Sequence, residues 1–162
     1  MLSRLYLTLA QQLVAGVQAS TPLTGGSGAP ECRCAISRAY YAAYNVAVDF
    51  LDRLGFETTN SHNCHQAVQF ALNQSGNASL RDVSTFLNTL HTERRRADYE
   101  MRNTRPEEVS HADAMVKVAE TAIALVDSVL SDTSLWGAIA TAVLNYVNTS
   151  QTAALRRKSG KA

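Results

Sequence analysis

Apolar residues recur at intervals of three and four along almost the whole chain of 162 residues, and this spacing limits the fold more than any other feature. No stretch alternates polar and apolar residues for long enough to predict a strand. The chain is therefore expected to be all-α, with five or six helices. These helices are predicted over residues 2–17, 30–54, 62–75, 80–101, 110–129 and 135–147.

Proline, glycine and serine residues predict where these helices begin and end. The stretch at 20–30, which includes Pro22, should interrupt the chain, and Pro30 suits the first turn of the second helix. Gly55 is typical of a helix C-terminal cap, because glycine adopts positive φ without strain. Ser61 and Ser110 are each expected to cap the helix that follows.

The apolar stripes predict which side chains are buried. In the first helix Leu5 and Leu9 belong to the stripe, and in the fourth helix Ala97 and Met101 do. The last helix carries an apolar face that includes Trp136. Because so short a helix is unstable alone, this face must pack on its own bundle or on a second chain. The tail that ends in "LRRKSGKA" is expected to fray.

Length and composition indicate one domain without an anchor. We expect a core bundle at 1–130, with residues 131–162 packed on it or extending it. The net charge of +1 means that any nucleic-acid contact must come from a local patch. Three cysteines cannot close a disulfide framework, and no apolar run is long enough for a membrane span. A cytoplasmic protein without membrane attachment is predicted.

The densest charge in the chain lies in "HTERRRADYEMR", residues 91–102. His91, Arg95, Asp98 and Arg102 are separated by steps of four, three and four, which places them on one face of a helix. Three interpretations remain open for this face. It is a solvated surface joined by Arg–Asp pairs, a surface that binds the phosphate groups of RNA, or a nuclease active site.

Three segments in order resemble the HEPN family, in particular a small prokaryotic branch of it. They are "SRAYYAAYNVAVDFL", then "LGFETTNSH", then "RRRADYE", and the resemblance covers about residues 1–130. It implies an up-and-down four-helix bundle, here with additional short and C-terminal helices. Many members are metal-independent RNases of defence or toxin–antitoxin systems, and others are non-catalytic binding modules.

The resemblance also points to site residues. Active members carry an arginine, four to six residues and a histidine near the start of the last core helix, a pattern that Arg105 and His111 match. In the "ADY" segment Asp98 and Tyr99 stand where many active members have histidine. RNA cleavage needs a proton acceptor, a proton donor and a cation beside the phosphorus, which suit histidine and arginine.

Two sets of site residues follow. For catalysis the candidates are His91, Asp98 and His111. For phosphate or RNA binding the candidates are Arg38, Arg95, Tyr99, Arg102 and Arg105. Each has a structural alternative. Arg38 could form a buried ion pair, for example with Asp98, and Tyr99 could simply pack beside it.

No cofactor or metal site is predicted. His62, Cys64 and His65, together with Cys32 and Cys34, do not have zinc-finger spacings. The expected partners are RNA or a nucleotide, a second copy of the chain in a homodimer, and a cognate antitoxin or defence-complex protein. The alternative function is a non-catalytic subunit that dimerises and docks on a partner enzyme.

Overall fold

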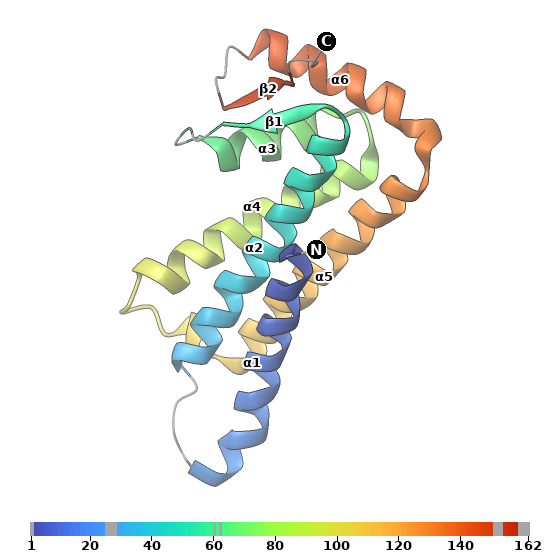
Figure 1. Cartoon of the computed structure of the whole chain (residues 1–162). Helices are drawn as coiled ribbons and strands as arrows, with labels where there is room; N and C mark the ends of the chain where they lie inside the picture. Colours follow the sequence, from blue (N-terminus) through green and yellow to red (C-terminus); the bar gives the residue numbers. More distant parts are fainter. Residues whose placement is uncertain (1, 25–28, 60, 62, 151–153, 159–162) are drawn as a thin grey trace. The chain divides into compact units, whose positions relative to one another are not determined.

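Six α-helices dominate the computed structural model, which describes residues 2–24, 29–59, 61, 63–150 and 154–158 (Figure 1). The helices are α1 (Leu2–Thr24), α2 (Ala29–Arg53), α3 (Cys64–Asn73), α4 (Ala78–Tyr99), α5 (Val109–Ser131) and α6 (Trp136–Thr149). The shorter elements are the 3-10 helices η1 (Arg105–Glu107) and η2 (Thr133–Leu135) and the strands β1 (Phe56–Thr58) and β2 (Leu155–Arg157). The predicted all-α fold is confirmed.

Two compact units divide the chain. Unit 1 contains Met1–Ala43 and Phe86–Thr121, and unit 2 contains Tyr44–Thr85 and Ala122–Ala162. The helices α2, α4 and α5 each contribute residues to both units. The segment after residue 130, which was predicted to pack on or extend the core bundle, belongs to unit 2.

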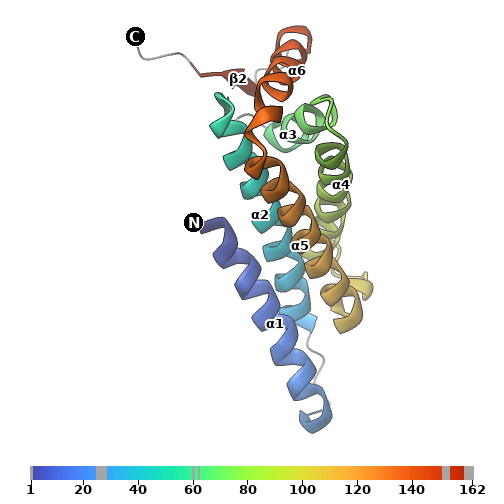
Figure 2. The same ribbon diagram turned by 90° about the vertical axis from the view of Figure 1, so that its right-hand side faces the viewer.

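Unit 1 is a four-helix arrangement in which neighbours run in opposite directions (Figures 1 and 2). Side-chain contacts join each neighbouring pair. They are Tyr6 with Tyr41 between α1 and α2, Tyr40 with His91 between α2 and α4, Glu93 with His111 between α4 and α5, and Gln11 with Glu120 between α1 and α5. Within this unit the helices form the expected up-and-down bundle.

Unit 2 contains α3, α6 and a two-stranded sheet. The strands β1 and β2 pair antiparallel, with Phe56 opposite Arg157 and Thr58 opposite Leu155. Leu155 is fully buried, and Ile139 and Val143 on α6 are buried as well. The apolar face of α6 therefore packs inside its own unit, and the tail at 155–157 is a strand where fraying was expected.

Several predicted boundaries hold. Pro30 lies in the first turn of α2, and α2 ends at Arg53. Gly55 follows with φ of +90°, and its N–H donates to the Asp52 carbonyl at 3.0 Å. The residue thus takes the cap conformation for which glycine is suited.

Other boundaries were wrong. The helix α1 continues to Thr24, through the stretch that was expected to break it. Ser110 lies inside α5, which begins one residue earlier. Asn63 is the N-cap residue of α3, and the Ser61 hydroxyl accepts a bond from the Asn63 N–H at 3.4 Å. Asn77 caps α4 by accepting a bond from the Leu80 N–H at 3.1 Å.

Three apolar side chains were wrongly expected to be buried. Met101 is 65% exposed because α4 ends two residues before it. Leu5 is 60% exposed and Leu9 is 41% exposed on α1, whereas Ala10, Val14 and Val17 form the buried face. None of the helices in the described ranges combines the length and the hydropathy that crossing a membrane requires.

Candidate functional site

A cluster of three polar side chains, two of them buried, joins the last two turns of α4 to the start of α5. The Nε2 atom of His111 lies 2.9 Å from Oε2 of Glu93, and each of these side chains is 8% exposed. The Nη1 atom of Arg96 lies 2.5 Å from the other carboxylate oxygen of Glu93. His111 stands in the first turn of α5, as predicted, and its partner carboxylate was not predicted.

The electrostatics of this cluster favour an ionised Glu93. Burial by itself would raise the pKa of Glu93, but the hydrogen bond with His111 and the positive charge of Arg96 bring it below its ordinary value. An ionised carboxylate can only accept, so the His111 Nε2–H donates to it. This bond fixes the orientation of the ring and leaves Nδ1 as the atom that could exchange a proton.

A second face of α4 meets α2. His91 packs against the Tyr40 ring, with 5.4 Å between ring centroids. Burial lowers the pKa of His91, and the charges of Arg94 and Arg95 lower it further, so its imidazole is neutral near pH 7. Arg94 pairs with Asp98 at 2.6 Å.

Arg94 also stacks between two tyrosine rings. Its guanidinium carbon lies 5.3 Å from the Tyr41 centroid and 5.5 Å from the Tyr99 centroid. An Arg94 Nη2–H donates to the Tyr99 hydroxyl at 3.4 Å. The Tyr99 side chain is nevertheless 69% exposed, so one face of this arrangement is open to solvent.

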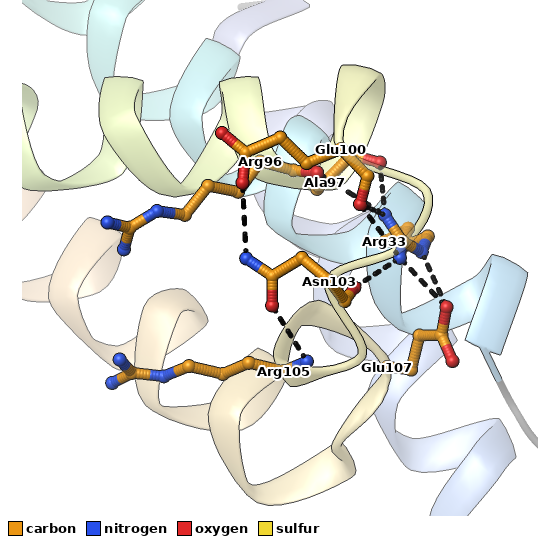
Figure 3. Close-up of polar contacts among 7 residues, drawn as sticks. All are labelled: Arg33, Arg96, Ala97, Glu100, Asn103, Arg105 and Glu107. Carbon is orange, nitrogen blue, oxygen red and sulfur yellow. Dashed lines mark hydrogen bonds and ion pairs between the residues drawn. The ribbon is translucent and has the colours of Figure 1, made fainter.

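Arg33 on α2 holds the C-terminal end of α4 (Figure 3). Its guanidinium donates to the backbone carbonyls of Ala97 at 2.9 Å and Asn103 at 2.5 Å, and more weakly to those of Arg96 and Glu100. It also forms an ion pair with Glu107 at 2.8 Å. The last carbonyls of a helix lack hydrogen-bond donors within the helix, and here the Arg33 guanidinium provides these donors.

The held segment presents exposed arginines. Arg102 and Arg105 lie in this segment. Arg95 lies on α4, one helical turn before its last residue, Tyr99. All three residues are exposed. Among the described residues none of the three has an ion-pair partner. Figure 3 shows the side chains of Arg96 and Arg105 extending toward the same side. We call Arg95, Arg102 and Arg105 the arginine surface.

The predicted site residues separate into different places. His91 packs on Tyr40 of α2 and Asp98 pairs with Arg94 of its own helix, whereas His111 meets Glu93 on another face of α4. Arg102 lies in a turn after α4, so it does not continue the helical stripe that was expected. Arg38 stacks over the Tyr6 ring at 5.6 Å, and Asp98 pairs with Arg94, so the suggested Arg38–Asp98 pair was wrong.

Four residues of the site were not predicted: Arg33, Glu93, Arg94 and Arg96. Two signals could have found some of them. Arg33 is in phase with the buried residues Ile36 and Tyr40, which is unusual for a charged residue unless it is paired. Glu93 and Arg96 have the i, i+3 spacing of an ion pair, but His111 is eighteen residues away and no local signal links it to Glu93.

The cysteines and histidines do not assemble into a metal site in the part of the chain that the structure describes. Cys32 is buried, and Cys34 and Cys64 are half-buried free thiols. His65 packs against the Tyr44 ring at 4.4 Å. His62, which was weighed as a ligand, lies outside the described residues.

Comparisons with models of protein families, with curated proteins and with solved structures give no match to this chain. The assignment of a function therefore rests on the residues and on their geometry.

Proposed function

We propose that this chain is a HEPN-like protein of a prokaryotic defence or toxin–antitoxin system and that it binds RNA through the arginine surface. The observation that carries the proposal is the set of three exposed arginines without ion pairs, which lie in the last two turns of α4 and in the segment that follows it. Arginine donates two parallel hydrogen bonds to phosphate oxygens, so unpaired guanidinium groups are suited to an RNA backbone. The three sequence segments that resemble the HEPN family support the same function.

The surrounding structure supports binding by this surface. Arg94, Arg96 and Arg33 have carboxylate partners, which leaves the other three arginines available to a ligand. Arg33 fixes the backbone that carries Arg102 and Arg105, so less conformational freedom is lost when RNA binds. The exposed Tyr99 ring beside this surface offers a face on which a base can stack.

A binding titration with labelled single-stranded RNA tests this proposal. We expect the triple variant Arg95→Ala, Arg102→Ala, Arg105→Ala to bind at least tenfold more weakly. The matched control is Arg53→Ala, Arg81→Ala, Arg157→Ala, which removes three exposed arginines from unit 2. Equal losses in the two triple variants would mean that only net charge matters, and no loss in the first would refute the proposal.

Metal-independent cleavage of the bound RNA is a second candidate activity, favoured by the Glu93–His111 pair. In such a reaction His111 takes the proton of a 2′-hydroxyl, and the oxygen attacks the adjacent phosphorus. The bond to the 5′-oxygen breaks, that oxygen takes a proton from water, and a 2′,3′-cyclic phosphate is formed. Arg105 is suited to stabilise the phosphorane. We place binding first because His111 is only 8% exposed.

An RNA digestion in the presence of EDTA tests the cleavage candidate. We expect His111→Ala to abolish cleavage and EDTA to have no effect. His65→Ala is the control, because His65 lies in unit 2 beside Tyr44. Cleavage that survives the loss of both His111 and His91 would exclude this chemistry, and the protein would then be an RNA-binding module.

A further inference from the structure

Unit 2 carries a pair of hollows between α3 and α6. The larger, about 560 Å³ in volume, is lined by Phe70, Gln74, Ala142, Asn145, Tyr146 and Thr149. The smaller, about 320 Å³, is lined by Asn63, Gln66, Ala67, Phe70, Tyr146 and Ser150. Both volumes are within the range of sites for small ligands.

Two aromatic rings line both hollows. Phe70 on α3 is 46% exposed, which is unusual for phenylalanine, and Tyr146 on α6 is half-buried. The two rings are not in contact with one another within the described residues. A planar group can therefore reach a ring face without displacing the other ring.

The remaining lining supplies hydrogen-bonding groups without charge. Four carboxamides and two hydroxyls surround the rings, and none of the described residues that line either hollow has an acidic or basic side chain. The Ser150 hydroxyl is buried at the edge of the smaller hollow, next to the Tyr146 side chain. A ligand with its own donors and acceptors would satisfy these groups.

Such a lining selects an uncharged, planar, polar ligand. Nucleobases have this chemistry: they stack on aromatic rings, and carboxamides pair with their edges through one donor and one acceptor. A phosphate group would lack a cation here. An aliphatic peptide side chain would leave the carboxamides without partners.

We propose that these hollows bind an unpaired nucleobase, with Phe70 and Tyr146 as the stacking rings and Gln74 and Asn145 as the groups that read its edge. The proposal rests on the proposed RNA binding only for the source of the base. The arginine surface would bind the phosphates of single-stranded RNA, and the hollows of unit 2 would bind an unpaired base of single-stranded RNA.

Titration with adenosine, followed by the side-chain amide signals of Gln74 and Asn145 in NMR spectra, tests the hollows without any phosphate. We expect millimolar adenosine to shift these signals and an equal concentration of ribose to leave them in place. No shift with adenosine would overturn the base proposal. Equal shifts with ribose would identify a sugar site and would overturn it as well.

A second titration uses RNA and an abasic oligonucleotide of the same length, which keeps the phosphates. We expect Phe70→Ala to weaken RNA binding roughly 5- to 100-fold and to leave abasic binding unchanged, because stacking depends on the base. Phe70→Trp, which retains a ring, should restore most of the affinity, and Phe70→Leu, which retains only apolar bulk, should not.

The two proposals fail in different ways. If the chain binds no RNA but adenosine still shifts Gln74 and Asn145, the proposed function fails and the base site stands. If RNA and the abasic strand bind equally and Phe70→Ala changes neither, the base site fails and the arginine surface stands.

Discussion

Arg33 and Glu107, which are 74 residues apart in the sequence, are joined by two hydrogen bonds to one carboxylate oxygen, at 3.0 Å from Nε and 2.8 Å from Nη2. The same guanidinium also donates hydrogen bonds to free carbonyls at and after the end of α4. One side chain therefore joins α2, α4 and η1. The arrangement needs a planar group with five N–H donors, which only arginine provides.

Arg33→Lys tests this arrangement. A lysine keeps the charge but can reach only one or two of the acceptors, so we expect the free energy of unfolding to fall by about 2–4 kcal/mol. The backbone amides at 100–107 should also exchange faster with solvent. Chemical denaturation and hydrogen exchange measure the two effects. Arg95→Lys, on an exposed residue without an ion pair, is the control and should change the free energy by less than about 0.5 kcal/mol.

The pH dependence of stability tests the Glu93–His111–Arg96 cluster, in which Glu93 and His111 are buried. The pKa of Glu93 is lower in the folded chain than its ordinary value of 4.5. Its contribution is therefore complete above about pH 4.5 and is lost as the pH falls through the folded pKa. We expect Glu93→Gln to reduce the free energy of unfolding by about 1–3 kcal/mol at pH 7 and by less at about pH 3.

Urea denaturation across this pH range gives the measurement. Glu108→Gln is the matched control, because Glu108 is exposed and has no ion pair within the described residues. A difference between wild type and Glu93→Gln that stays constant from pH 7 to pH 3 would show that the carboxylate charge is unimportant to the cluster.

Thiol reactivity tests the packing at the start of α2. Burial raises the pKa of the Cys32 thiol, and the negative charges of Glu31 and Glu107 raise it further. Because the thiolate is the reactive form, we expect Cys32 to be alkylated at least tenfold more slowly than Cys34 or Cys64 in the native protein. Mass spectrometry of the digested protein gives the three rates, and the difference should disappear in denaturant. Equal native rates would contradict the burial of Cys32.

The homodimer expected from the resemblance can be tested on α1. Leu5 and Leu9 are one helical turn apart and exposed, which is an apolar surface that a second copy could cover. We expect sedimentation at micromolar concentration to give twice the 17.6 kDa of one chain. Leu5→Gln with Leu9→Gln should give the monomer, and Gln12→Ala with Gln18→Ala should not. A monomeric wild type would rule the homodimer out.

The helices were predictable from the sequence because each depends on local spacing. Ile36, Tyr40, Ala47 and Leu51 repeat at helical intervals, and they are buried as the pattern predicts. The strands were not predictable. Each has three residues, and β1 pairs with a segment about a hundred residues later, so neither contains a local signal. The pairing instead depends on tertiary contacts such as the burial of Leu155.

The candidate site was predicted only in part, for a similar reason. Arg105 and His111 could be found because their spacing is local in the sequence. The partners that fix their surroundings come from other helices: Glu93 reaches His111 from α4, and Arg33 reaches the α4 end from α2. Such pairs depend on how helices are placed side by side, which periodicity alone does not determine.

The salt dependence of RNA binding tests the central claim most directly. Each phosphate neutralised on a single strand contributes about −0.7 to the slope of log Kobs against log salt concentration. If Arg95, Arg102 and Arg105 each hold one phosphate, the slope of the triple alanine variant should be shallower than that of wild type by about 2. An unchanged slope, or the same change in the Arg53, Arg81 and Arg157 control, would contradict the account.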